Sequence, residues 1–205
     1  MSGEQKLKEG DEVTQVVNTT NASELLFFTS QHQVYKAKSN DFSDGKASLL
    51  GDYIPSKLEF DEAESAIYMA TLEKYVGFMV FVFDNGRIAR VPMSSYATKT
   101  NRKKLINAYC SKFTLHTAIY CEEECDLLLT STNGRILIIN TTSLSEKATK
   151  DNGGIAVMTQ KRGQRIFSVE KFVEGSIEKA YRYRPKNLPA AGNTKKDEVI
   201  EQMTF

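Results

Sequence analysis

The stretch FVFDNGRIAR, residues 81–90, joins an apolar run to a second β-rich run through the pair Asn85-Gly86. Asn-Gly between two such runs is a strong hairpin signal, because a type I′ turn requires positive φ at both central residues. The returning run carries Arg87 and Arg90. The stretch therefore predicts a β-hairpin with two basic residues on its second strand.

The same pattern occurs twice more in the chain. Residues 127–139 read LLLTSTNGRILII, with Gly134 at the turn. Residues 25–36 read LLFFTSQHQVYK, with His32 in place of the turn glycine. The three turn residues are 54 and 48 positions apart. A period of about 50 residues with roughly four strands in each unit is typical of radial β-repeats.

These repeats predict an all-β, propeller-like fold in which neighbouring units pack against one another. We expect a frayed N-terminus at 1–10, a single domain at 11–184 and a tail at 185–205 with a short helix at 197–203. The expected repeats are 11–59, 60–112 and 113–171, with a partial fourth at 172–184. Besides the hairpins, the expected strands are 12–17, 66–72, 105–110, 117–121, 155–159 and 166–169.

Composition narrows the class of protein. The chain has 205 residues, of which 40% are hydrophobic, so a packed core is expected. Its net charge of +1 does not by itself indicate a nucleic-acid binder. Three cysteines favour a reducing compartment over a disulfide framework. The sequence has no apolar run long enough to span a bilayer and no signal peptide at its start, so we expect a cytoplasmic protein with no membrane partner.

Metal and catalytic sites are not expected. Cys121 and Cys125 flank three glutamates, but the chain has only two histidines and no second cysteine pair. A structural zinc site requires four ligands, so small, partly buried thiols are the better interpretation. No P-loop, nucleophile elbow or dinucleotide fingerprint is present. We therefore predict no cofactor, no metal, no catalytic residue and no small-molecule substrate.

Basic residues are segregated along the chain. No acidic residue lies between Arg87 and Lys112, whereas acidic residues cluster at 59–64 and 122–126. If equivalent strands line one rim, the basic residues form a stripe that follows a phosphate backbone. Such a stripe contacts phosphates without reading bases. The alternative is that solvated loops simply carry lysine and arginine. The predicted DNA-binding residues are Arg87, Arg90, Lys99, Arg102, Lys103, Lys104, Arg135, Lys161, Arg162, Arg165, Arg182 and Arg184.

The repeat unit resembles the C-terminal domain of the A subunit of bacterial type IIA topoisomerases, gyrase and topoisomerase IV. The resemblance rests on the apolar strand, the Thr-Ser or Gly turn and the Val or Ile that follows it with a basic residue, at 25–36, 80–90 and 127–136. It covers about residues 12–172. It implies a β-pinwheel, a propeller-like arc of about four repeated four-stranded blades that exchange strands. The DNA-cleaving residues of that family lie in other domains.

The chain departs from the family pattern in its near-neutral charge, its three to four units and its lack of an intact gyrase wrapping motif, QRRGGKG. The nearest match is 160–165, which we interpret as a basic hairpin turn between the strands at 155–159 and 166–169. A topoisomerase IV-like or otherwise divergent member is therefore expected in preference to a gyrase that wraps DNA.

The resemblance implies a non-catalytic domain that binds and bends double-stranded DNA and presents it to the cleavage core. It also implies as partners the rest of the A subunit together with the ATPase B subunit, at the bacterial nucleoid. Two alternatives remain at this point: a propeller-like protein-interaction module without DNA binding, and a small-ligand sensor built from the same blades.

Overall fold

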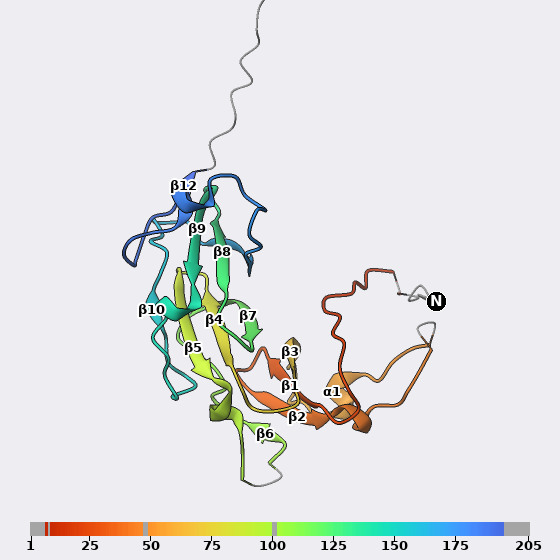
Figure 1. Ribbon diagram of the computed structural model, residues 1–205. Coiled ribbons are helices and arrows are strands. Elements are labelled where there is room, and N and C mark those ends of the chain that lie inside the picture. The colour runs from red at the N-terminus through yellow and green to blue at the C-terminus, as the bar shows by residue number, and fades with distance from the viewer. Residues whose placement is uncertain (1–6, 8, 47–48, 100–101, 195–205) are drawn as a thin grey trace, which may run out of the picture. The chain divides into compact units, whose positions relative to one another are not determined.

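The computed structural model describes residues 7, 9–46, 49–99 and 102–194 (Figure 1). This part of the chain forms three four-stranded sheets, which confirms the all-β fold class. The strands are β1 (Glu24–Thr29), β2 (Val34–Lys38), β3 (Ala66–Leu72), β4 (Phe78–Phe83), β5 (Arg87–Pro92), β6 (Lys104–Leu105), β7 (Leu115–Cys121), β8 (Asp126–Ser131), β9 (Arg135–Asn140), β10 (Ile155–Ala156), β11 (Ile166–Lys171) and β12 (Asn193–Thr194).

Helical segments are short. They are the 3-10 turns η1 (Ser39–Asp41), η2 (Met93–Tyr96), η3 (Thr141–Ser143) and η4 (Ala180–Tyr183) and the single α-helical turn α1 (Ile54–Lys57). None of the helices in the described ranges has the length and apolar character needed to cross a bilayer. The helix expected at 197–203 lies outside the described residues.

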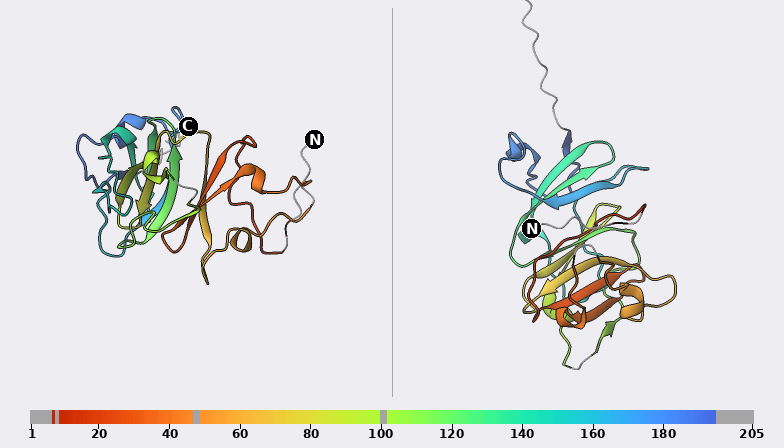
Figure 2. Two further views of the ribbon diagram at one scale, coloured as in Figure 1. Left: turned by 90° about the horizontal axis from the view of Figure 1, so that it is seen from below. Right: turned by 90° about the vertical axis from the view of Figure 1, so that its right-hand side faces the viewer.

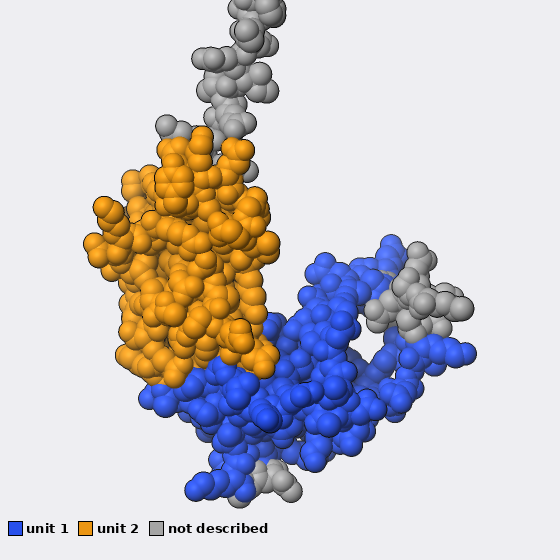
Figure 3. Space-filling model, in the orientation of Figure 1, with its two compact units in different colours: residues 1–77, 92–111, 148–151 blue, residues 78–91, 112–147, 152–205 orange. Residues whose placement is uncertain are grey.

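The chain divides into two compact units (Figure 3). Unit 1 comprises residues 1–77, 92–111 and 148–151, and it contains sheet A, with the strand order β3-β1-β2-β6. The three long strands of sheet A lie side by side in both views of Figure 2. Unit 2 comprises residues 78–91, 112–147 and 152–205, and it contains sheets B and C, with the orders β10-β5-β4-β7 and β11-β8-β9-β12.

All three sheets follow one connection rule. A hairpin forms the centre of each sheet, as β1-β2, β4-β5 or β8-β9. Its first strand pairs with a long strand that comes next in the chain, which is β3, β7 or β11. Its second strand pairs with a two-residue strand from further along, which is β6, β10 or β12. Each sheet therefore takes strands from beyond its own hairpin, and the repeat boundaries expected from the sequence stay a prediction.

The hairpin turns are not of type I′. The amide of Gly86 donates to the carbonyl of Phe83 at 2.9 Å, and Gly86 has a φ of 79°, whereas Asn85 is not among the residues with positive φ. The loop therefore has three residues, with the left-handed residue last, as in a type I turn followed by a glycine bulge. Gly134 and His32 occupy the same place, with φ of 72° and 59° and amide hydrogen bonds to Ser131 and Thr29.

The predicted strand at 12–17 does not form. These residues are exposed and have no strand geometry, although Gln15 hydrogen-bonds through its side chain to both backbone groups of Met69 on β3. In the connection rule, a long strand pairs with the first strand of the hairpin before it. No earlier hairpin lies among the described residues, so this segment has no hairpin partner despite its β-rich composition.

Two further strands are shorter than predicted. In place of 105–110 the strand is Lys104–Leu105, and in place of 155–159 it is Ile155–Ala156. In both cases the chain turns so that its amides donate to the carbonyl of a hairpin turn residue: Ala108 to His32, and Met158 to Gly86. In the expected partial fourth unit, 172–184, the structure has η4 in place of a hairpin.

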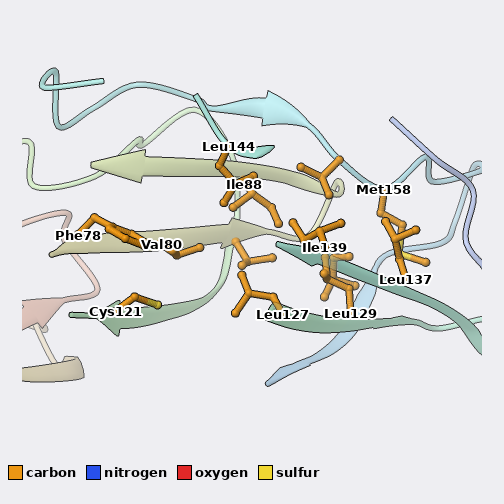
Figure 4. Close-up of a cluster of buried hydrophobic side chains, with 13 residues drawn as sticks. Phe78, Val80, Ile88, Cys121, Leu127, Leu129, Leu137, Ile139, Leu144 and Met158 are labelled. Carbon is orange, nitrogen blue, oxygen red and sulfur yellow. The ribbon is translucent and has the colours of Figure 1, made fainter. Parts of the chain in front are cut away.

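Sheets B and C of unit 2 share a cluster of mostly aliphatic buried side chains (Figure 4), and a smaller second cluster lies around Ile138 and Tyr183. Val80 of β4, Leu127 and Leu129 of β8 and Leu137 of β9 are at most 2% exposed. Unit 1 has its own cluster, in which Tyr35 packs against Phe60 with ring centroids 4.4 Å apart. Successive side chains of a strand point to opposite faces, and in the hairpin strands β1, β4 and β9 both faces are largely buried.

Arg90 ties β5 to the loops around sheet C. Its side chain is 13% exposed, and its guanidinium lies 2.7 Å from a carboxylate oxygen of Glu124 and 3.0 Å from one of Glu146. It also donates to the carbonyl of Thr141 and lies 3.8 Å from the ring centroid of Phe78. Burial raises the pKa of Glu124, but hydrogen bonds from Arg90 and Thr141 and the charge of Arg90 outweigh it, so this pKa lies below its ordinary value.

The turn glycines supply a test of the hairpin geometry. A Cβ at Gly86 would lie 2.0 Å from the carbonyl oxygen of Met158, whereas a Cβ at Gly134 would meet nothing within 4 Å. We expect Gly134→Ala to destabilise the fold by about 1–2 kcal/mol through backbone strain alone. Gly86→Ala should lower the free energy of unfolding by at least about 2 kcal/mol more than Gly134→Ala does, because the backbone of Met158 must shift. Urea unfolding followed by circular dichroism measures both, and equal losses would contradict the close approach.

The Arg90 network supplies a pH-dependent test. Arg90→Gln should lower the free energy of unfolding at neutral pH by about 1–3 kcal/mol, because charge-assisted hydrogen bonds are lost. Because the folded-state pKa of Glu124 is lowered, its contribution is complete above its unfolded pKa and disappears as pH falls through the folded value. The difference in the free energy of unfolding between wild type and Arg90→Gln should therefore become smaller as the pH falls.

Lys57→Gln is the control for this network, because Lys57 pairs with Asp52 at 3.3 Å in a more exposed position. We expect it to cost less than about 1 kcal/mol. Equal stability of wild type and Arg90→Gln at neutral pH, or a gap that does not change with pH, would show that the network does not stabilise unit 2.

Candidate nucleic-acid interface

The loop that follows η2 in unit 1 is attached to β2 at two points. The backbone amide of Lys36 donates to the carbonyl of Lys103 at 2.7 Å, next to the short pairing of β2 with β6. The Lys36 ammonium donates to the Thr98 hydroxyl at 3.2 Å. These contacts place the basic loop predicted from the sequence beside the two lysines of β2, Lys36 and Lys38, which share a face because they are two residues apart.

A groove of about 490 Å³ lies between the loop and the strand. Its lining is predominantly basic: five cationic side chains against two carboxylates, Glu24 and Asp41. A second hollow of about 310 Å³ shares Lys36, Lys103 and Asp41 with it, so the lining is continuous along β2. The basic residues of the first groove are Lys36, Lys38, Lys99, Arg102 and Lys103.

Lys36 is the most desolvated cation of this groove. Its ammonium lies 4.8 Å from the ring centroid of Tyr75, another residue of the lining. Burial lowers the pKa of Lys36, and the attraction of Glu24 only partly offsets this effect. An anion bound in the groove would favour the charged form of Lys36, because opposite charges raise the pKa of an amine. The groove is therefore better suited to an anionic ligand than to a neutral one.

The sequence-predicted residues of this loop divide into two kinds. Lys99, Arg102 and Lys103 are exposed, and the described residues give them no ion pair. Lys104 instead lies 2.7 Å from a carboxylate oxygen of Asp61, and its ammonium is 5.3 Å from the ring centroid of Tyr35. Lys104 is therefore partly neutralised within the protein.

Arg87 and Arg90 are not free surface cations. Arg87 donates to the carbonyls of Gly153 and Gly154, directly before the short strand β10. Arg90 is engaged by Glu124 and Glu146. These contacts use each guanidinium within the fold, and a role of either arginine in DNA binding stays a prediction.

Arg135 repeats the role of Arg87 in sheet C. It donates to the carbonyl of Gly192 at 2.8 Å, directly before β12. Arg184 lies 2.6 Å from Asp126 and 3.5 Å from Glu174, and is likewise engaged. Arg182 is exposed, and the described residues give its side chain no ion pair. Arg182 and Arg184 are thus both exposed, but of the two only Arg184 is paired with carboxylates in the described residues.

The basic segment at 160–165 forms an exposed turn in unit 2. The amide of Gln164 donates to the carbonyl of Lys161 at 2.9 Å, and Gly163 has a φ of 80°. Lys161, Arg162 and Arg165 are exposed around it. The turn is confirmed, but it does not connect paired strands as predicted, because β10 belongs to sheet B and β11 to sheet C.

Sequence reasoning missed the contribution of β2. Lys36, Lys38 and Tyr75 line the groove, yet only the loop residues were predicted. The alternation of VYKAK at 34–38 was a usable signal, because it places both lysines on one face. The pairing of β2 with 104–105 was not readable, because a two-residue strand carries no periodicity.

Two of the cysteines lie close together in unit 2. The sulfur atoms of Cys121 and Cys125 are 3.5 Å apart, and burial raises the pKa of Cys121 to about 12. In the described ranges, no group of three or more histidine, cysteine, aspartate or glutamate residues is arranged to hold a metal ion.

The chain has recognisable relatives among characterised proteins, although no family model matches it. It is 25% identical over 138 residues to the DNA gyrase A protein of Mycolicibacterium smegmatis, which is 66% of this chain and 16% of that protein. It is 22% identical over 173 residues to that of Mycobacterium tuberculosis, covering 83% of this chain and 21% of that protein. The chain thus spans about a fifth or less of these relatives.

Solved structures with a similar fold point to the same proteins. The C-terminal domain of DNA topoisomerase IV aligns with a TM-score of 0.69 at 20% identity, covering 83% of this chain and 53% of that one. The E. coli ParC C-terminal domain aligns with a TM-score of 0.60 at 15% identity, covering 80% of this chain and 68% of that one.

The similarity to the solved domains shows the fold, whereas the similarity to the gyrase subunits is one of sequence. Both comparisons point to the same group of proteins. The chain has the β-pinwheel fold of these C-terminal domains, and its sequence is similar to those of DNA gyrase A subunits.

Proposed function

We propose that the chain is a non-catalytic accessory domain that binds and bends double-stranded DNA for a type IIA topoisomerase, of the topoisomerase IV-like or gyrase-like kind. The observation that carries the proposal is the groove beside β2, in which cations from a strand and a loop line one space. Phosphate contacts of this kind are independent of base sequence.

The groove combines two features that favour a phosphodiester backbone. Its walls carry cations on both sides, so a backbone within it contacts Lys36 and Lys38 from β2 and Arg102 and Lys103 from the loop. Its lysine at 36 is partly desolvated, which strengthens attraction to a phosphate relative to a fully hydrated ammonium. Under this proposal, exposed cations of unit 2 also contact the DNA. They are Lys161, Arg162, Arg165 and Arg182.

In the proposed enzyme the domain presents a DNA segment to the cleavage core. Its partners under this proposal are the rest of the A subunit and the ATPase B subunit. Its proposed location is the cytoplasm, at the bacterial nucleoid. The curated relatives are whole gyrase A subunits, several times longer than the aligned region, which supports the view that such a domain works beside a separate cleavage core. No catalytic role is proposed for this chain alone.

A charge-reversal titration tests the groove. Wild type should bind a short duplex with an affinity that falls steeply between about 50 mM and about 200 mM salt, because bound cations release counterions. Arg102→Glu combined with Lys103→Glu should weaken binding to all sequences alike. It should also reduce the magnitude of the slope of log K against log salt by about 2. Fluorescence anisotropy with two unrelated duplexes measures both quantities.

Lys46→Glu combined with Lys74→Glu is the matched control. Both lysines are exposed residues of unit 1 outside the groove lining, and the change in net charge is the same. This control should keep nearly all of the wild-type affinity. If both double variants lose affinity equally, the groove is not the DNA site. If wild type shows no affinity at low salt, the DNA proposal fails and a protein-interaction module becomes the better interpretation.

A further inference from the structure

The long outer strand of every sheet contains a β-bulge at the same place. In sheet A, Thr29 and Phe28 pair with Ala66 and Tyr68, so the register skips Ile67. The equivalent skipped residues are His116 in β7 and Phe167 in β11. A bulge leaves one residue without a partner and redirects its side chain, and such bulges are often found beside functional sites.

The three bulged side chains differ in what they contact. His116 lies beside the hairpin turn of its sheet, with Nδ1 3.3 Å from a carboxylate oxygen of Asp84. Ile67 is 44% exposed, and Phe167 is 68% exposed. A phenylalanine on a strand next to a well-packed core is ordinarily buried, so this position leaves a large aromatic face available to a partner.

The residues directly before Phe167 are fixed by packing and by backbone hydrogen bonds. The side chain of its neighbour Ile166 is 1% exposed in the core of unit 2, and the Ile166 amide donates to the carbonyl of Asp84 at 3.1 Å. Arg165 exchanges hydrogen bonds with Thr132: its carbonyl accepts from the Thr132 amide at 2.9 Å, and its amide donates to the Thr132 hydroxyl at 3.2 Å. The segment is thus anchored to two hairpin turns, so little entropy is lost when a partner stacks on Phe167.

The surroundings of Phe167 on the chain are basic. Residues 160–169 contain Lys161, Arg162 and Arg165, all exposed, and no acidic residue. Farther along β11, Glu170 and Lys171 offset each other in charge. An exposed aromatic ring beside three cations is complementary to a polyanion that also offers flat apolar faces, which is the chemistry of a nucleic acid.

We propose that Phe167 is a wedge that enters a base step of duplex DNA, with Lys161, Arg162 and Arg165 holding the phosphates on either side. Apolar side chains that partly unstack a base step bend the duplex, and flanking cations stabilise the bent form. This inference deepens the DNA-binding function proposed above and rests on it, but it concerns a site in unit 2 and not the groove of unit 1. It names the residue through which bending would occur.

The test uses the full chain and a duplex with 2-aminopurine at one pyrimidine–purine step, because such steps unstack easily. Wild type should raise the fluorescence of the probe on binding, since unstacked 2-aminopurine is brighter. Phe167→Ala should abolish most of this rise and weaken binding by about tenfold, the usual weight of one base–aromatic stack. Phe167→Leu should keep part of the rise, because leucine also serves as a wedge.

Val173→Ala is the matched control, because Val173 is 67% exposed in the same unit without the basic turn beside it. It should bind and brighten the probe as wild type does, and thermal unfolding should show that all variants are folded. If wild type binds DNA without brightening the probe, or if Phe167→Ala brightens it equally, the wedge is overturned while the DNA-binding proposal stands. If wild type does not bind the duplex at low salt, both proposals fail.

Discussion

Every sheet of this protein depends on strands that come from elsewhere in the chain. A hairpin has two open edges, and unpaired amides and carbonyls at such edges are costly when buried. Here the first strand of each hairpin is closed by the next long strand, and the second by a two-residue strand beyond it. The carbonyl of the turn residue then receives an amide of the returning chain, as at His32 and Gly86. This closure couples segments that are far apart in sequence and makes the left-handed turn residue a structural requirement.

The same closure determines which cations remain for a ligand. Arg87 and Arg135 follow their turn glycines directly, and each donates to a carbonyl just before a short closing strand. Arg90 joins β5 to the carboxylates of two loops. The arginines of the β4-β5 and β8-β9 hairpins are therefore used inside the fold. Most of the cations left to solvent lie in the connections between strands, such as Lys99, Arg102 and Lys103 and the turn at 161–165.

Much of the fold could be predicted from local pattern, and the failures share one cause. The hairpins and the long strands at 66–72 and 117–121 follow from apolar, β-rich runs and turn residues, which are properties of the segment itself. The strand at 12–17 has the same composition but no hairpin to pair with. The two-residue strands exist only through their partners. The turn type was misjudged because Asn-Gly suits both a type I′ turn and a type I turn followed by a left-handed glycine, and only the hydrogen bond to Phe83 distinguishes them.

The candidate site shows the same division between local and tertiary information. Runs of lysine and arginine identify the loop at 99–104, but only the pairing of β2 with β6 brings Lys36 and Lys38 to it. Conversely, a charge count assigns Arg90 to the surface, whereas its 13% exposure and two carboxylates place it inside the structure. A near-neutral chain can thus present a basic groove, because its charges are unevenly distributed and some carboxylates pair with arginines inside the fold. Net charge alone therefore does not locate the basic surface of this chain, whereas the ion-pair state of each cation does.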